Sequence, residues 1–322
     1  MHALARGLIA AALTFAFAPL AWPQSWPAKP IRMIVNTAAG AGPDAVARIY
    51  APRLGQALGQ PIVIENRQGA AGSGSIGIEA VARSAPDGYT LLNAPGSTIV
   101  LGPNLYKYGV EVARDLEPVA PTVRAAAFLV VRPGLPVHSL AELIAYARAN
   151  PGKLTFGTPG SGTAPHIGAV MLMRTAKIQA THVPYKGVAQ ALADLMGERI
   201  DFMFDPGPAV PQIKAGKARL LAVVDAARSP IFPDTPTMAE AGTDVNVVIV
   251  SGVFAPAGTP RDIVSRLNRE IGRVLQTAEV RAALAALGNE AVTASPEEFA
   301  ALMHRDRERF GVIMREANIR ID

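Results

Sequence analysis

Cysteine is absent from this 322-residue chain. Without cysteine the protein has no disulfide framework, no thiolate metal site and no cysteine nucleophile. Charge is also sparse, because 18% of the residues are charged and the formal net charge is only +5. Where basic residues gather, as at Arg305 and Arg307, acidic residues stand between them. That alternation is typical of a solvent-exposed helix face and argues against a nucleic-acid-binding surface.

Long hydrophobic runs are missing as well, apart from one near the N-terminus. Residues 7–20 follow Arg6 without a charge, but the run is shorter than the roughly 20 apolar residues that span a bilayer. We therefore predict a secretory signal peptide over residues 1–25, cleaved between about residues 21 and 26, and export to the periplasm. A buried N-terminal helix is the alternative, although such a helix normally has one polar face. No later segment is long and apolar enough to predict a membrane span.

What the chain does contain is a regular alternation of strand and helix patterns. Short β-rich runs at 31–35, 62–64 and 89–93 are separated by one helix pattern at 44–58 and by another that follows the glycine-rich segment 69–77 and runs to about residue 82. This β-α-β-α-β order predicts a mostly parallel sheet flanked by helices, with ligands at the carboxyl ends of its strands.

A second series of the same kind begins near residue 128. Ser139 and Glu142 predict a capping box at the start of one helix. The other elements are expected as strands at 128–131, 154–156, 179–183, 200–204 and 220–224, and as helices at 165–175, 188–196 and 209–215. A β-branched strand at 245–254 then precedes a helical tail.

The tail has to bury its apolar stripe on one of the two sheets, so we expect the strand at 245–254 to lead back to the first one. The predicted fold class is α/β, a clamshell of two lobes, each a mostly parallel sheet flanked by helices, joined by two crossing strands. Lobe 1 is expected to be discontinuous, with residues 26–124 and 247–322, and lobe 2 to comprise residues 125–246. A cleft between the lobes would bind an anion at helix N-termini, where backbone N–H groups are free.

The loop after the first strand permits two interpretations. Residues 40–45 fit G-x-G-x-x-A between a strand and a helix, and Glu65 ends the next strand, as in a dinucleotide-binding fingerprint. Four residues, 36–39, separate the strand from the first glycine, however, where the fingerprint needs a tight turn. The same loop is suited to bind a small carboxylate through its backbone.

A hydrolase is a further possibility. Ser161, His166 and Asp205 have the residue types of a catalytic triad, but no serine lies in G-x-S-x-G and no H-E-x-x-H motif is present. Ser161 and Thr163 precede Pro165 at an expected helix start, where their hydroxyls either cap the helix or bind a ligand carboxylate. We predict that the protein is not an enzyme and uses no metal or cofactor.

Several segments resemble one family of receptors. They are KPIRMIV at 29–35, IVIENRQGAAG at 62–72, APDGYTLL at 85–92, HVPYKG at 182–187, MFD at 203–205, IKAGKARLLAV at 213–223, FPDTPTMAEAG at 232–242 and FAPAGTP at 254–260. Together they are similar to the Bug family, the periplasmic substrate-binding proteins of tripartite tricarboxylate transporters.

The resemblance implies a type II periplasmic-binding-protein-like clamshell that captures an organic acid, an amino acid or an aromatic acid by lobe closure. It also implies a two-component integral membrane transporter as partner and a monomeric receptor; an exported ligand sensor that signals without transport is the alternative. The implied ligand-binding residues are Thr37, Ala38, Ala39, Gly40, Ala41, Asp44, Gly96, Ser97, Thr98, Ser161, Thr163, His166 and Asp205. Asp44 and Asp205 would either receive a ligand ammonium or orient loops.

The chain departs from the family pattern close to the expected pocket. Residues 36–41 read NTAAGA where the family usually has PFAPGG, so an aromatic wall is lost and a hydroxyl is gained. The glycine-rich segment is about two residues longer than usual, and Val250 and Ser251 stand where aromatic residues are common. These departures leave the identity of the ligand open.

Overall fold

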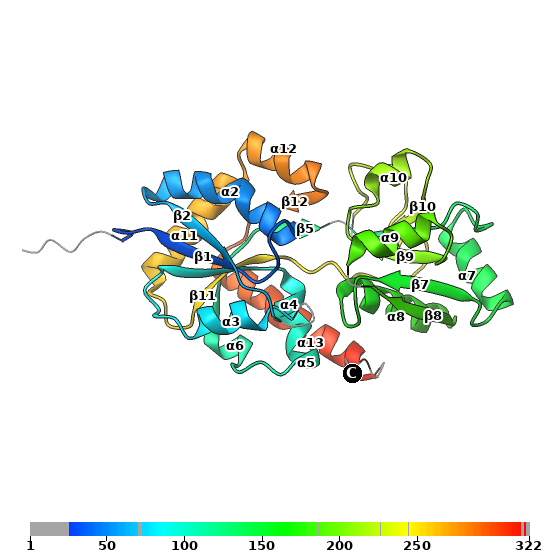
Figure 1. Cartoon of the computed structure of the whole chain (residues 1–322), viewed down its shortest axis with the longest axis horizontal. Helices are drawn as coiled ribbons and strands as arrows, with labels where there is room; N and C mark the ends of the chain where they lie inside the picture. The colour runs from blue at the N-terminus through cyan, green and yellow to red at the C-terminus, as the bar shows by residue number, and fades with distance from the viewer. Residues whose placement is uncertain are drawn as a thin grey trace, which may run out of the picture.

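The computed structural model describes residues 26–69, 73–125, 127–185, 187–225, 227–243 and 245–316, together with Ile319. The predicted signal peptide lies outside these residues. The described part of the chain forms two α/β bodies that lie side by side along the long axis of the molecule (Figure 1).

The first sheet has five strands in the order β2-β1-β3-β11-β4. Their bounds are β1 Ile31–Val35, β2 Ile62–Asn66, β3 Thr90–Ala94, β4 Leu116–Pro121 and β11 Gly252–Pro256. Strand β1 pairs in parallel with β2 and β3, with Ile31 opposite Ile62 and Met33 opposite Leu91, whereas β11 runs antiparallel to β3 and β4. This sheet therefore combines strands from both ends of the chain.

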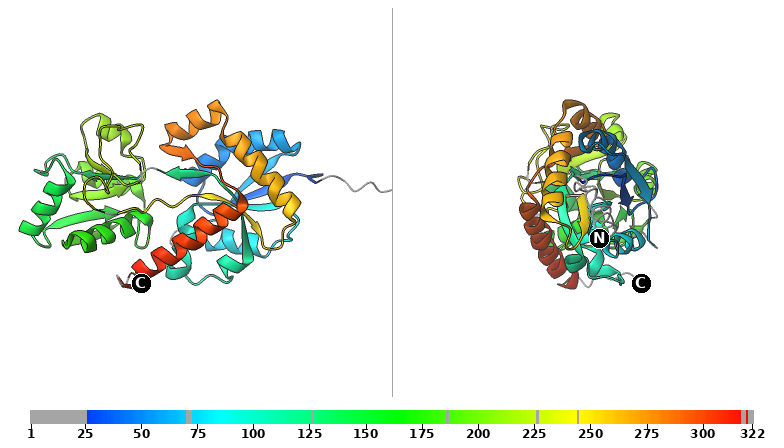
Figure 2. Two further views of the ribbon diagram at one scale, coloured as in Figure 1. Left: turned by 180° about the vertical axis from the view of Figure 1, so that it is seen from behind. Right: turned by 90° about the vertical axis from the view of Figure 1, so that its left-hand side faces the viewer.

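Helices cover both faces of the first sheet (Figure 2). They are α2 Gly42–Leu58, α3 Ser75–Ala82, α4 Gly96–Val100, α5 Gly102–Leu105, α6 Val112–Asp115, α11 Arg261–Leu275, α12 Ala278–Ala286 and α13 Pro296–Glu316. Helix α11 packs on α2 and β4, and α13 packs on β4, so the C-terminal helices bury their apolar stripes on this sheet. Tyr50, Met33 and Leu267 are fully buried where α2 and α11 meet the strands.

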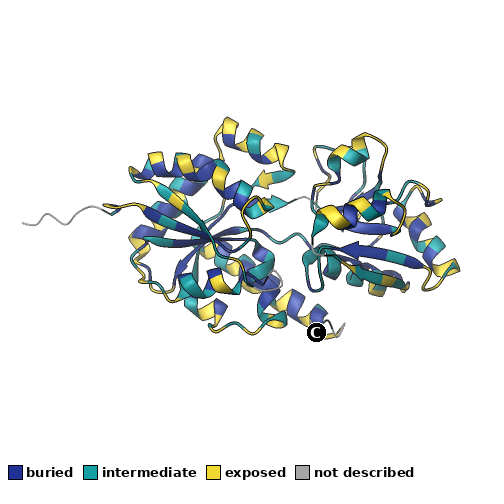
Figure 3. Ribbon diagram, in the orientation of Figure 1, coloured by how far each residue is buried: buried dark blue, intermediate teal, exposed yellow. Residues whose placement is uncertain are grey.

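The second sheet has the order β10-β6-β9-β7-β8. Its strands are β6 Phe128–Val131, β7 Leu154–Thr158, β8 Ala180–Pro184, β9 Phe202–Asp205 and β10 Arg219–Val223, and its helices are α7 Leu140–Ala149, α8 Ala164–Ala176, α9 Val188–Met196 and α10 Val210–Lys214. The central strands β6 and β9 are buried on both faces, and the outer helix faces are exposed (Figure 3).

Two segments of chain pass between the bodies. One includes β5 Val123–Ala125, which pairs with β12 Asn289–Ala291 in a two-stranded sheet. The other is residues 245–251, which lead into β11 without regular secondary structure. The strand expected over 245–254 is therefore shorter, because its first part runs between the bodies and only residues from Gly252 onward lie between two strands of a sheet.

The α/β fold class is confirmed, with one difference in strand direction. Each five-stranded sheet contains two parallel and two antiparallel pairings, so both are mixed sheets and not mostly parallel ones. The antiparallel pairs arise where the chain enters or leaves a body, at β11 and at β6. Among the described residues, no helix combines the length and the hydropathy needed to cross a bilayer.

Candidate functional site

A cavity of about 780 Å³ lies between the two bodies. Its wall is built by the loops after β1 and β3, the loops after β7 and β9, both crossing segments and the turn after α12. Pockets that hold small organic molecules have volumes of about 300–1,000 Å³. Both sheets thus contribute to one site of suitable size.

Three helices of eight or more residues begin at this cavity. Gly42 of α2, Ala164 of α8 and Val188 of α9 are the first residues of their helices, and all three line the wall. No side chain of a described residue caps any of these three N-termini. Free N–H groups and the helix dipole favour an anion there. The described residues that line the cavity include no charged side chain, so these backbone groups are its main means of attracting a carboxylate.

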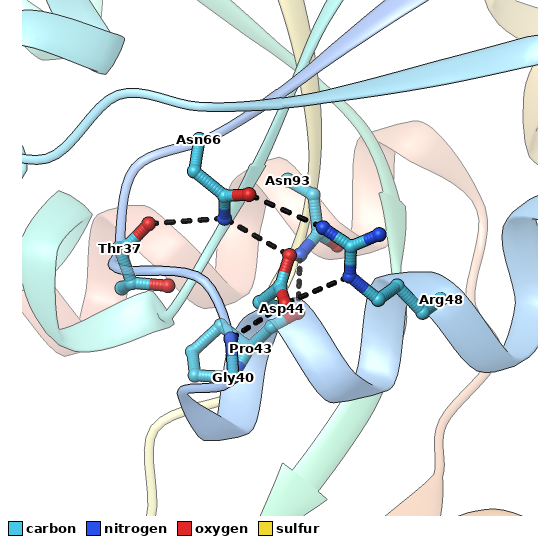
Figure 4. Close-up of polar contacts among 7 residues, drawn as sticks. All are labelled: Thr37, Gly40, Pro43, Asp44, Arg48, Asn66 and Asn93. Carbon is cyan, nitrogen blue, oxygen red and sulfur yellow. Dashed lines mark hydrogen bonds and ion pairs between the residues drawn. The ribbon is translucent and has the colours of Figure 1, made fainter.

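The loop after β1 is held from behind by Asp44 (Figure 4). The Asp44 Oδ2 atom accepts hydrogen bonds from the Gly40 amide and from Arg48 Nε, both at 2.8 Å, and Oδ1 accepts one from Asn66 Nδ2 at 2.9 Å. Asn66 Nδ2 also donates to the Thr37 carbonyl, which fixes the start of the loop. The hydrogen bond from Arg48 is the main reason that the pKa of Asp44 falls to about 2, although burial opposes the shift. Of the two roles considered for Asp44, this geometry fits loop orientation.

The loop after β3 approaches the second crossing segment very closely. A Cβ atom at Gly96 would lie 2.1 Å from the Val250 carbonyl oxygen, so only glycine fits there. Ser97 lines the cavity beside it. The Thr98 hydroxyl accepts a hydrogen bond from Asn36 and donates one to Pro95, and it therefore stabilises the loop.

His166 supports the loop after β7. Its Nδ1 atom accepts a hydrogen bond from the Gly162 amide at 2.9 Å, and its ring stacks on His182 with centroids 4.2 Å apart. Burial, with a smaller contribution from His182, lowers the pKa of His166 to about 4. The Thr163 hydroxyl donates to the Gly160 carbonyl across the same loop. A neutral imidazole is required here, because a protonated Nδ1 could not accept the Gly162 hydrogen bond.

Asp205 organises the turn after β9. It is fully buried, and its Oδ1 atom accepts hydrogen bonds from the amides of Gly207 and Ala209, each at 2.8 Å. Its Oδ2 atom has no partner among the described residues. Burial is the main cause that raises the pKa of Asp205 to about 6.

The cavity brings together only part of the predicted site. Thr37, Gly40, Gly96, Ser97 and Thr163 line it. The other predicted residues do not, namely Ala38, Ala39, Ala41, Asp44, Thr98, Ser161, His166 and Asp205. Asp44, Thr98, His166 and Asp205 form hydrogen bonds with backbone groups of the loops behind the wall. Ala38 and Ala39 are exposed outside the cavity. The ligand-binding roles of all eight residues stay predictions.

The described residues do not show the arrangement that a hydrolase or a dinucleotide-binding enzyme requires. Among the described residues, no hydrogen bond joins Ser161, His166 and Asp205. Glu65, the acid of the dinucleotide fingerprint, forms ion pairs with Arg32 and Arg67.

Sequence reasoning missed the first crossing segment at Thr122, Val123 and Ala125, and it also missed two turns of the wall. One is the proline-rich turn from Pro206 to Pro211, and the other is the turn from Ala285 to Asn289. The spacing of three prolines at 206, 208 and 211 was a usable signal for the first turn. The second follows an ordinary helix end, and no sequence pattern distinguishes it.

Comparison with known proteins places this arrangement in a family. Residues 46–319 match the family model described as "Tripartite tricarboxylate transporter family receptor". The chain is 36% identical over 302 residues to protein BugT of Bordetella pertussis, with 92% of each chain covered.

Solved structures agree with that match. The periplasmic binding protein BugD superimposes with a TM-score of 0.77 at 32% identity, over 92% of this chain and 100% of BugD. The R. palustris protein Rpa4515 with adipate gives 0.80 at 33% identity, over 92% and 100% of the two chains. MatC from Rhodopseudomonas palustris with bound malate gives 0.76 at 32% identity, over 89% and 99%. The resemblance seen in the sequence is confirmed, and the chain belongs to the tripartite tricarboxylate transporter receptor family of solute-binding proteins.

Proposed function

We propose that this receptor captures a small carboxylate in the cavity between its two bodies and delivers it to a membrane transporter. The observation that carries the proposal is the meeting of the uncapped N-termini of α2, α8 and α9 at a cavity lined by no charged side chain among the described residues. Free amides at helix N-termini bind anions without a cation. Two relatives of known structure hold adipate and malate, which supports the same chemistry here.

The proposed mechanism is lobe closure. Residues 26–124 and 247–322 form one lobe and residues 125–246 the other, and a ligand that touches both favours the closed form through its higher affinity for that form. A two-component membrane transporter then recognises the closed receptor, which acts as a monomer in the periplasm after residues 1–25 are removed. No covalent chemistry and no cofactor is part of this mechanism.

A thermal-shift screen of dicarboxylates, acidic amino acids and aromatic acids tests the proposal. A ligand at 100 times its dissociation constant stabilises the folded protein by about 2.7 kcal/mol, which gives a measurable rise in Tm. Absence of a shift with every acid, or turnover of esters or amides, would contradict the proposed function.

The site itself is tested with a carboxylate hit from that screen. Thr163→Ala removes the hydroxyl that holds the loop before α8 by donating to the Gly160 carbonyl, so the N-terminus of α8 should be less well ordered and the shift should decrease. An unchanged shift in this variant would place the carboxylate elsewhere.

A further inference from the structure

The described part of the cavity wall has no charged side chain and is largely apolar. Seven prolines line it, together with several valines, and Phe204 is its aromatic residue among those described. Side chains with hydrogen-bonding groups are few: Thr37, Asn93, Ser97, Thr122, Thr163, Ser251 and Asn289. Most of the surface that a ligand meets therefore suits an apolar body.

The polar side chains are unevenly distributed. Among the described residues, six of the seven belong to the strands and loops of the first sheet, the crossing segments or the turn after α12, and Thr163 belongs to the second body. The Thr163 hydroxyl already donates to the Gly160 carbonyl. The wall of the second body, with Val188, Phe204 and Val210, thus offers mainly apolar contacts beyond its helix N-termini.

Three carboxylates adjoin wall residues in sequence, those of Asp44, Asp205 and Glu290, and Glu290 is paired with Arg124. Asp44 has about 1% of its surface exposed, and both its oxygens accept hydrogen bonds from protein donors, including Arg48. Asp205 is fully buried behind the turn that contains Gly207, and one of its oxygens binds two backbone amides of that turn. None of the three side chains forms part of the cavity wall.

We therefore expect the cavity to bind an anionic group more favourably than a cationic one. A carboxylate finds the N-termini of three helices, where N–H groups and the helix dipole stabilise negative charge. An ammonium group finds no countercharge among the described residues of the wall, and the helix dipoles there have the wrong sign for it. Removing an ammonium from water without a partner is strongly unfavourable.

We infer that the cavity selects carboxylic acids that have an apolar body and no ammonium group, and that it discriminates against amino acids. The inference rests on the proposed function, because it concerns the same cavity and the same carboxylate. It adds what the rest of the ligand should be, namely an apolar body without an ammonium group.

Four acids with one six-carbon chain provide the test: hexanoate, hexanedioate, 2-aminohexanoate and 6-aminohexanoate. Isothermal titration of the mature protein with each is expected to give Kd values at least tenfold lower for hexanoate than for either amino acid. Equal or tighter binding of an amino acid would overturn the inference and leave the proposed function intact. Failure of all four acids to bind, together with the absence of a thermal shift from every acid of the screen, would contradict the proposed function itself.

A substitution in the cavity wall provides a second test of the inference, one that changes the protein and not only the ligand. Val188 is the first residue of α9 and half-buried at the cavity, and an acid in the first turn of a helix is well tolerated. Val188→Asp should improve the affinity for 6-aminohexanoate relative to hexanoate by about tenfold, whereas Val188→Asn should change both by the same factor. An unchanged ratio in Val188→Asp would overturn the inference.

Asp205 is the remaining candidate for an ammonium partner, because its Oδ2 atom has no partner among the described residues. Asp205→Asn keeps an oxygen acceptor for the Gly207 and Ala209 amides. We expect it to change the affinities for hexanoate and for the amino acids by the same factor. A selective loss of amino-acid binding would show that Asp205 receives the ammonium and would overturn the inference.

Discussion

Polar side chains just behind the cavity wall direct their hydrogen bonds into the loops that form it. Asp44, Thr98, His166 and Asp205 each bind at least one backbone group of a neighbouring loop. A sequence shows that such residues lie near the ends of strands, but not whether a side chain faces the ligand or the loop. The predicted site therefore names loops that line the cavity, and the ligand-binding roles of its individual residues stay predictions.

The Asp44 network predicts a pH-dependent contribution to stability. Asp44→Asn should lower the free energy of unfolding at pH 7 by about 1–3 kcal/mol, because buried donors lose a charged acceptor. The pKa of Asp44 is lowered to about 2 in the folded protein, so the carboxylate stabilises above its ordinary pKa of 3.8 and loses this effect as the pH falls through 2. Urea denaturation should show the gap between wild type and variant closing from pH 4 to pH 2.

The exposed Asp234 provides a matched control for Asp44. Asp234→Asn removes an acidic charge at the surface, and we expect a change within about 0.5 kcal/mol. A gap for Asp44→Asn that stayed constant down to pH 2 would argue against the ionised network.

His166 predicts a second pH effect in a different window. Its pKa of about 4 lies below the ordinary value of 6.5, so the unfolded chain binds more protons between these values and stability falls as the pH drops from 6.5 to 4. His166→Asn keeps an acceptor for the Gly162 amide and should flatten the decline, on the order of 2 kcal/mol over the window. The exposed His138, changed to Asn, should leave the decline as it is. An equal decline in His166→Asn would contradict the assignment.

At the scale of elements, hydrophobic periodicity and capping residues predicted most of the helices and strands of the described chain. The strand at Phe128–Val131 and the helix at Val188–Met196 appear with the expected bounds, and Ser139 caps α7 by accepting a hydrogen bond from the Glu142 amide. Strand direction was less predictable, because β11 joins the first sheet from far along the chain and runs antiparallel to its neighbours. The β-branched run before it suggested a strand, but propensity does not reveal whether a pairing partner is present.

The contact between α4 and the second crossing segment gives a prediction at this scale. Gly96→Ala would place a Cβ atom 2.1 Å from the Val250 carbonyl oxygen, so the crossing segment must shift, and we expect a loss of about 1–3 kcal/mol together with weaker ligand binding. Gly42 lines the same cavity, but a Cβ atom there meets nothing within 4 Å. Gly42→Ala should therefore fold with wild-type stability or slightly better. Chemical denaturation measures the free energy of unfolding of both variants. Equal values for Gly96→Ala and Gly42→Ala would show that the close contact between Gly96 and the Val250 carbonyl does not require glycine.

At the scale of the whole molecule, several contacts join the two bodies. The turn at Gly207 lies close to the turn at Leu287 and Gly288, and Gly162 lies against Leu105 of α5. Arg174 of α8 pairs with Glu316 of α13 at 2.9 Å. Two bodies and a return crossing were predictable from the order of elements, since the helical tail needs a sheet to cover. Which turns meet across the cavity was not, because that depends on the angle between the bodies and on side-chain lengths in both.

Arg124 links the two bodies at the first crossing and predicts how that angle is maintained. From β5 it contacts Asp225, which follows β10 of the second sheet, at 3.3 Å, and Glu290 of β12 at 2.5 Å. Arg124→Met keeps an apolar stem but leaves two acids without this shared cation, and their repulsion should favour a wider angle. We expect small-angle X-ray scattering to give a larger radius of gyration for the ligand-free variant and titration to give a carboxylate affinity several-fold lower, because closure must overcome the repulsion. Arg228→Met removes an ion pair to Glu240 within one body and should alter neither measurement, so an equal effect of both variants would show that Arg124 has no special role in closure.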